Sequence, residues 1–100
     1  MDEKKRALKN EWKQREHAAA QAAFPLPDPV LSQFFSAVEA AVATAGCDHT
    51  RSVSEKWLAD AGHDLAAVLP WLDATGGYCD CEVAANTKDH WLEHRAPTLH

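Results

Sequence analysis

Long apolar runs, an excess of positive charge and abundant cysteine are all missing from this 100-residue sequence. No apolar stretch reaches the roughly 20 residues that a membrane-spanning helix needs. The charged N-terminus lacks the apolar segment of a secretory signal, so we expect a reducing, cytoplasmic location. Ten Lys and Arg stand against fifteen Asp and Glu, and the net charge of −5 disfavours a general nucleic-acid-binding body. The 46% of apolar residues instead fits one small globular domain.

The three cysteines of the chain are not scattered. They fall in two short motifs, Cys47-Asp48-His49 and Cys79-Asp80-Cys81. Three thiolates and one imidazole are the ligand set of a closed, four-coordinate structural zinc site. We therefore predict that Cys47, His49, Cys79 and Cys81 bind zinc.

The spacing within each motif also predicts local structure. In an extended segment, side chains at positions i and i+2 point the same way, whereas in an α-helix they diverge by about 200°. Both motifs should therefore be extended or turn-like, and the prediction includes a short extended segment around residues 78–83. Gly46 and the Gly76-Gly77 pair, which precede the motifs, allow the chain to change direction there.

Other uses of these thiols remain open at this stage. An odd number of cysteines and a reducing compartment weigh against structural disulfides. Inert buried thiols, redox-active thiols and an iron–sulfur centre are the remaining alternatives. Asp48, Asp80 and Glu82 flank the ligands and are candidates for supporting them from the second layer.

The rest of the pattern is helical. A basic, alanine-rich helix is expected over residues 2–23, within an N-terminal unit of residues 1–24. A proline cluster then separates it from a zinc-stapled helical domain spanning residues 28–95. Asp28 is the expected N-cap of the next helix, Ser52 and Glu55 have the spacing of a capping box, and Asp64 can cap a helix that Pro70 should kink or split. The predicted fold class is mainly α, a small helical domain closed by a zinc site, with a projecting N-terminal helix.

The N-terminal helix differs from the body in charge. Residues 1–16 hold six Lys and Arg against four Asp and Glu. The cations could contact RNA phosphates if the protein is an accessory factor of a ribosome or another ribonucleoprotein. A solvated helix stabilised by its own ion pairs is the competing interpretation. The candidate phosphate contacts are Lys4, Lys5, Arg6, Lys9, Lys13 and Arg15.

Two runs resemble a known family. Gly46-Cys47-Asp48-His49-Thr50 and the run from Gly76 to Val83, together with the Trp-Leu pairs at 57 and 71 and Asn86, are similar to the bacterial domain-of-unknown-function family 2695. The resemblance covers about residues 30–87. It implies a small cytosolic bacterial protein and assigns no activity.

No catalytic constellation is apparent in the sequence. We find no Gly-rich phosphate loop, no metalloprotease helix and no serine nucleophile elbow. Four zinc ligands, three of them thiolates, would also make the metal a poor Lewis acid. The expectation is a non-catalytic interaction module with an unknown protein partner, and the alternatives are the RNA-associated factor and a zinc- or redox-responsive switch. His90 and His94 would share one face if residues 88–95 are helical, which gives a weak second metal pair.

Overall fold

The computed structural model describes residues 13–95, and within this range the chain is mainly helical and contains no strand. The predicted fold class is confirmed at that level. Residues 13–22 are helical, and the part of the predicted N-terminal helix before residue 13 lies outside the described range. The other elements are α2 (Asp28–Ala45), α3 (Ser52–Asp60), α4 (Leu65–Ala74), α5 (Asp80–Glu82), the π-helix η1 (Val83–Thr87) and α6 (Lys88–His94).

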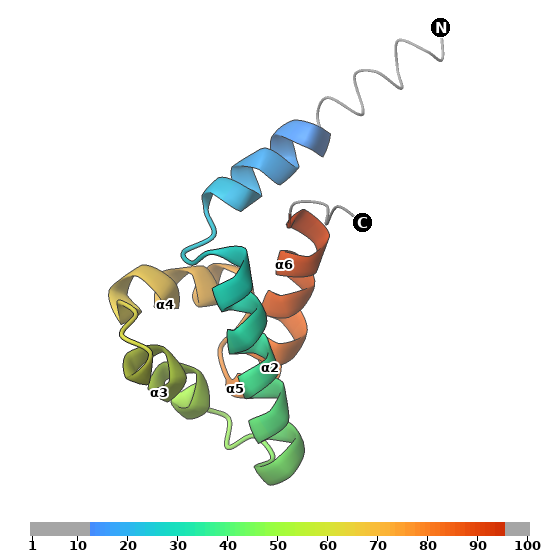
Figure 1. Ribbon diagram of the computed structural model, residues 1–100. Helices are drawn as coiled ribbons and strands as arrows, with labels where there is room; N and C mark the ends of the chain where they lie inside the picture. Colours follow the sequence, from blue (N-terminus) through green and yellow to red (C-terminus); the bar gives the residue numbers. More distant parts are fainter. Residues whose placement is uncertain (1–12, 96–100) are drawn as a thin grey trace, which may run out of the picture.

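Helix α2 forms the centre of the body, with α3 and α4 on one side and α6 on the other (Figure 1). Its apolar residues recur at helical spacing, so they form one continuous buried stripe. Phe35 lies between two tryptophans, with ring centroids 5.2 Å from Trp91 and 6.5 Å from Trp71. The buried core comprises Leu31, Phe34, Phe35, Val38, Leu58, Val68, Trp71, Leu72, Val83 and Trp91.

The N-terminal helix extends away from this body at the end where α2 begins and α6 ends (Figure 1). The chain turns between them at the predicted proline cluster, and Phe24 packs edge-on against Trp71 with the ring centroids 5.7 Å apart. None of the described helices is both long enough and apolar enough to cross a membrane.

The extended segment predicted for residues 78–83 is wrong. Cys79 is extended, with φ −144° and ψ 170°, but helix α5 begins at the next residue. Asp80 and Glu82 lie in the first turn, where negative side chains interact favourably with the helix dipole. The alternation of six residues was too short a signal to separate a strand from a helix start.

One of the three predicted helix caps is confirmed. The Asp64 carboxylate accepts the backbone N–H of Ala66 at 3.0 Å, which confirms it as the cap of α4. Helix α4 then continues through Pro70 as a single element, so the predicted split does not occur.

Two other predicted caps are wrong. Asp28 is the first residue of α2 and not its cap, and its carboxylate accepts hydrogen bonds from Trp91 and Arg95. The capping box predicted at Ser52 and Glu55 is also absent. Helix α3 begins at Ser52, and the preceding residue, Arg51, makes no capping hydrogen bond with its side chain.

Candidate metal centre

The fold brings all three cysteines together from two connections. Helix α2 ends at Ala45, and the following Gly46, with a φ of 76°, turns the chain so that Cys47 lies in the loop before α3. Cys79 and Cys81 lie on either side of the first residue of α5. The backbone N–H of Cys81 donates to Cys47 Sγ at 3.4 Å, and the Cys47 thiol interacts with both other thiols. Cys47 is therefore the centre of a three-thiol cluster.

The thiols differ in exposure and in acidity. Cys79 is buried, Cys47 is half-buried and Cys81 is exposed. The backbone N–H groups of Cys81 and His49 lower the pKa of Cys47, since both stabilise its thiolate. The hydrogen bond with Cys47, followed by partial desolvation beside the other thiols and by the charge of Cys47, raises the pKa of Cys81 to about 11. At Cys79, the backbone N–H of Glu82 lowers the pKa of the thiol. Burial and the neighbouring Cys47 outweigh this effect, so the pKa of Cys79 is raised.

These shifts have one electrostatic consequence. Ionising Cys47 opposes the ionisation of its two neighbours, so a cluster of three thiolates needs a compensating cation. A thiophilic divalent ion would supply that charge and release the thiol protons on binding.

His49 belongs to the turn that presents Cys47, and its backbone N–H donates to Cys47 Sγ at 3.4 Å. It adopts a φ of 67°, a left-handed conformation that is uncommon for a residue with a Cβ. The Asp48 carboxylate fixes the turn by accepting the Thr50 N–H at 3.0 Å and the Thr50 hydroxyl at 2.6 Å. The same hydrogen bonds from Thr50 lower the pKa of Asp48. The His49 residue itself is exposed.

The predicted four-ligand set is not assembled. Across residues 13–95, no three His, Cys, Asp or Glu side chains form a group that could hold a metal ion as they stand. The three thiols interact with one another, and His49 is held next to them by its backbone. Zinc binding therefore stays a prediction.

Asp80 has a role that the sequence did not reveal. Its carboxylate is 2% exposed and accepts the backbone N–H groups of Val53 and Ser54, at 3.1 and 3.0 Å. The Ser54 hydroxyl donates to the same group at 2.7 Å. Asp80 thus caps α3 from a distant part of the chain, while its own N–H donates to the Thr50 carbonyl at 2.9 Å. The acid between the two thiols therefore locks α5 to the loop that carries Cys47.

A cavity of about 240 Å³ opens beside the cluster, between the end of α2 and the start of α3. Cys47, Asp48 and Asp80 are among the residues that line it. Acidic groups next to thiols favour a cation over an anionic ligand. Glu82, the third predicted supporting residue, is half-buried in α5.

The glycine turn before the second motif, Gly76-Gly77, packs against the π-helix η1. The amide of Asn86 donates to the Gly76 carbonyl at 3.0 Å. The N–H of Gly77 donates to the Leu72 carbonyl at 2.7 Å, and a Cβ at Gly77 would lie 2.4 Å from Thr87 Oγ1. Gly77 is therefore a point of close packing that sets the position of the segment before Cys79.

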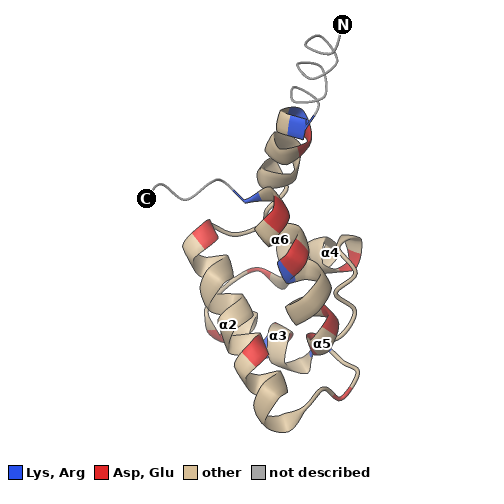
Figure 2. Cartoon of the chain, turned by 90° about the vertical axis from the view of Figure 1, so that its right-hand side faces the viewer, with Lys and Arg blue, Asp and Glu red and all other residues tan. Residues whose placement is uncertain are grey.

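The candidate phosphate contacts are only partly described. Lys13 and Arg15 are exposed on the N-terminal helix, whose outer end carries basic residues (Figure 2). Lys4, Lys5, Arg6 and Lys9 lie outside the described residues. The RNA-facing role of this helix stays a prediction.

Comparison with known proteins agrees with the motifs. The family model described as "Protein of unknown function (DUF2695)" matches residues 34–86. The chain belongs to this family. The matched range contains both cysteine motifs, the glycine turn and Asn86, and it excludes the N-terminal helix.

Curated relatives extend the likeness without adding an activity. Proteins from Mycobacterium bovis and from two strains of Mycobacterium tuberculosis are each 27% identical to this DUF2695 chain over 85 residues. The alignment covers 85% of this chain and 86% of each relative. All three carry the description "uncharacterized protein". No solved structure matches the chain.

Proposed function

We propose that this DUF2695 protein binds one structural zinc ion through Cys47, Cys79, Cys81 and His49, and acts as a cytoplasmic, non-catalytic interaction module. The observation that carries the proposal is the convergence of three thiols around Cys47 from two separate connections. His49 would supply the imidazole, because it lies two residues from Cys47 in the same turn. Thiolate-rich sets with one imidazole suit zinc better than harder cations such as magnesium.

The surroundings of the cluster favour a structural use of the metal. The site would join the loop after α2 to the start of α5, and Asp80 already ties these segments together through α3. Ligation would close the loop between the two motifs and add binding free energy to folding. With four protein ligands, no coordination position is left for a reacting water.

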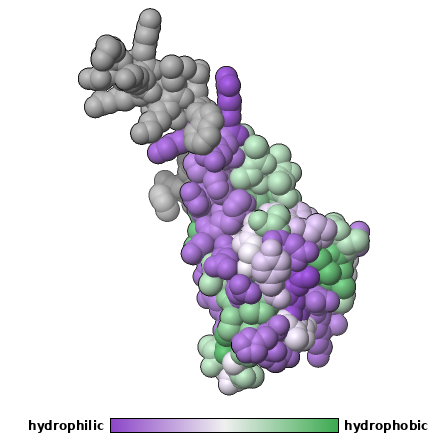
Figure 3. Space-filling model, turned by 180° about the vertical axis from the view of Figure 1, so that it is seen from behind, coloured by the Kyte–Doolittle hydropathy of each residue, from purple (hydrophilic) through white to green (hydrophobic). Residues whose placement is uncertain are grey.

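An interaction role is proposed from the surface. The face opposite the view of Figure 1 is largely hydrophilic, with apolar areas that are small and separate (Figure 3). Tyr78 and Leu92 are the large apolar side chains that remain exposed among the described residues, at 62% and 47%. Tyr78 directly precedes Cys79, so an intact metal centre would hold this aromatic side chain in a fixed place for a protein partner.

The second candidate function is association with RNA, favoured by the exposure of Lys13 and Arg15 on a helix that extends from the body. One affinity-capture experiment from bacterial lysate separates the two. For a protein-interaction module, the full chain should recover the same protein partners with and without nuclease, and Tyr78→Ala should reduce recovery several-fold. Leu92→Ala is the matched surface control.

The RNA-associated role predicts a different outcome of the same capture. Recovery should then fall steeply with added salt, because cation–phosphate contacts release counterions, and it should be lost after nuclease treatment. Removal of residues 1–23 should also abolish it. Recovery that is equal for every variant and unaffected by nuclease and salt would count against both candidate functions.

A further inference from the structure

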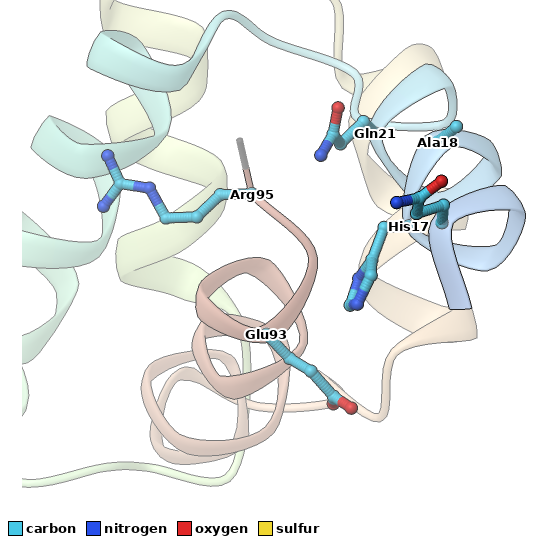
Figure 4. A pocket seen from close by; sticks show the side chains of 6 residues that line it. His17, Ala18, Gln21, Glu93 and Arg95 are labelled. Carbon is cyan, nitrogen blue, oxygen red and sulfur yellow. The ribbon is translucent and has the colours of Figure 1, made fainter. Parts of the chain in front are cut away.

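A second cluster of titratable side chains lies at the opposite end of the body from the thiols. His17 of the N-terminal helix and His94 of α6 face each other, with their Nδ1 atoms 2.8 Å apart and ring centroids 4.8 Å apart. His90, one turn earlier on α6, packs against His94 with the centroids 4.7 Å apart. Figure 4 shows the His17 ring pointing from its helix towards α6.

These imidazoles form much of the attachment of the N-terminal helix to the body. Besides the His17–His94 contact, Gln21 Nε2 donates to the His94 carbonyl at 2.8 Å. Phe24 then packs edge-on against Trp71 and His90, at 5.7 and 6.2 Å between centroids. A change in charge at the histidines therefore acts directly on the contact between the two helices.

A hydrogen bond between two imidazole nitrogens requires one N–H donor and one lone pair. It can form when both rings are neutral or when one is protonated. It cannot form when both rings are cations, because two N–H groups and two positive charges then face each other. The contact is thus compatible with at most one added proton.

The charged neighbours do not compensate for two cations. On α6, Glu93 lies 4.0 Å from His94 Nε2 and can balance one positive charge, but its own side chain is 71% exposed. Arg95 is paired with Asp28 of α2 and stacked on Trp91, so its charge is balanced within that pair and it offers the histidines no counter-charge. On the N-terminal helix, Lys13 lies one helical turn before His17, and Glu16 is next to His17 in sequence. Both are exposed and they are opposite in charge, so together they offer no net compensation.

We propose that His17 and His94 form an acid-sensitive latch that holds the N-terminal helix on α6 at neutral pH and releases it when both rings are protonated. Acid favours release, because a doubly protonated pair loses its hydrogen bond and places two like charges in contact. His90 acts in the same direction. Burial, followed by the charge of His94, lowers the pKa of His90. Phe24 packs edge-on against this ring, so loss of that contact would favour protonation of His90. Acid therefore shifts the equilibrium towards release, which uncovers Phe24 and the adjoining edge of Trp71.

Amide hydrogen exchange of the full-length chain between pH 7.5 and 5.5 tests the latch, after correction for the intrinsic pH dependence of exchange. Protection of residues 13–24 should fall at least fivefold more than protection of α2. His17→Gln, which keeps a neutral hydrogen-bonding side chain, should remove this pH response. His63→Gln is the matched control, since His63 stacks on Trp57 away from the latch, and it should respond as the unmodified protein does.

Two results would overturn the latch. One is protection of residues 13–24 that stays constant relative to α2 over this pH range. The other is a His17→Gln variant that keeps the full pH response. Amides from Asp80 to Thr87 report on the thiol centre in the same spectra, and an equal loss of protection there would assign the effect to general acid unfolding instead.

Discussion

Replacing Asp80 with alanine is expected to lower the free energy of unfolding by about 2–4 kcal/mol, the cost of leaving buried hydrogen-bond donors without their acceptor. The lost carboxylate caps α3 through the N–H groups of Val53 and Ser54, and it is almost completely buried. Denaturant unfolding followed by circular dichroism measures the change.

Two further substitutions make this prediction specific. Asp80→Asn keeps one acceptor oxygen but removes the charge, so it should fall between the alanine variant and the original protein. Asp48→Asn changes the other acid in a cysteine motif. Asp48 is exposed and accepts hydrogen bonds from Thr50 and, at 3.4 Å, from the Ser52 hydroxyl, so the variant should alter stability much less. Equal stability of Asp80→Ala and Asp48→Asn would contradict the capping role.

Gly77→Ala is expected to lower the free energy of unfolding by about 1–3 kcal/mol through overpacking. The new Cβ would lie 2.4 Å from Thr87 Oγ1, 3.0 Å from a methyl carbon of Val83 and 3.3 Å from the Leu72 carbonyl oxygen. Relief requires the glycine turn to move away from η1, which would also displace Cys79. Thermal and denaturant unfolding of the variant measure the effect.

Gly62→Ala provides the control for backbone strain without a clash. Gly62 has a φ of 81°, and a Cβ there would meet nothing within 4 Å. Gly62→Ala should lower the free energy of unfolding by about 1 kcal/mol, the usual penalty for a Cβ in the left-handed region. If Gly62→Ala proves more destabilising than Gly77→Ala, close packing at residue 77 is not what the turn requires.

The sequence predicted features that depend on neighbouring residues. The apolar stripe of α2, its end at Gly46 and the cap at Asp64 all follow from spacings of a few residues. The meeting of the cysteine motifs also follows, because the ligand types in the two motifs complement each other.

Features that depend on tertiary contacts were not predictable in this way. The carboxylate of Asp80 reaches α3 across 26 residues of sequence, and no local spacing distinguishes it from a solvated acid. The same holds for His17 and His94, which are 77 residues apart. The residues around Asp28 predicted that its carboxylate would cap α2. In the fold, the Trp91 N–H and the Arg95 guanidinium bind that carboxylate instead.

The local geometry of the second motif also escaped the spacing argument. That argument assumed that both cysteines lie in one type of structure. Cys79 is instead extended and Cys81 helical, so the two thiols approach Cys47 across the start of α5. A motif at a helix boundary combines two backbone conformations, and neither periodicity alone describes it.

The central claim is that the three thiols and His49 hold one zinc ion, and native mass spectrometry of the full-length protein tests it most directly. The account predicts one zinc per chain, loss of the metal in Cys47→Ser and Cys79→Ser, weakened retention in His49→Ala, and full retention in the His63→Ala control. A protein purified under reducing conditions that carries no zinc, or a Cys79→Ser variant that retains a full equivalent, would contradict it.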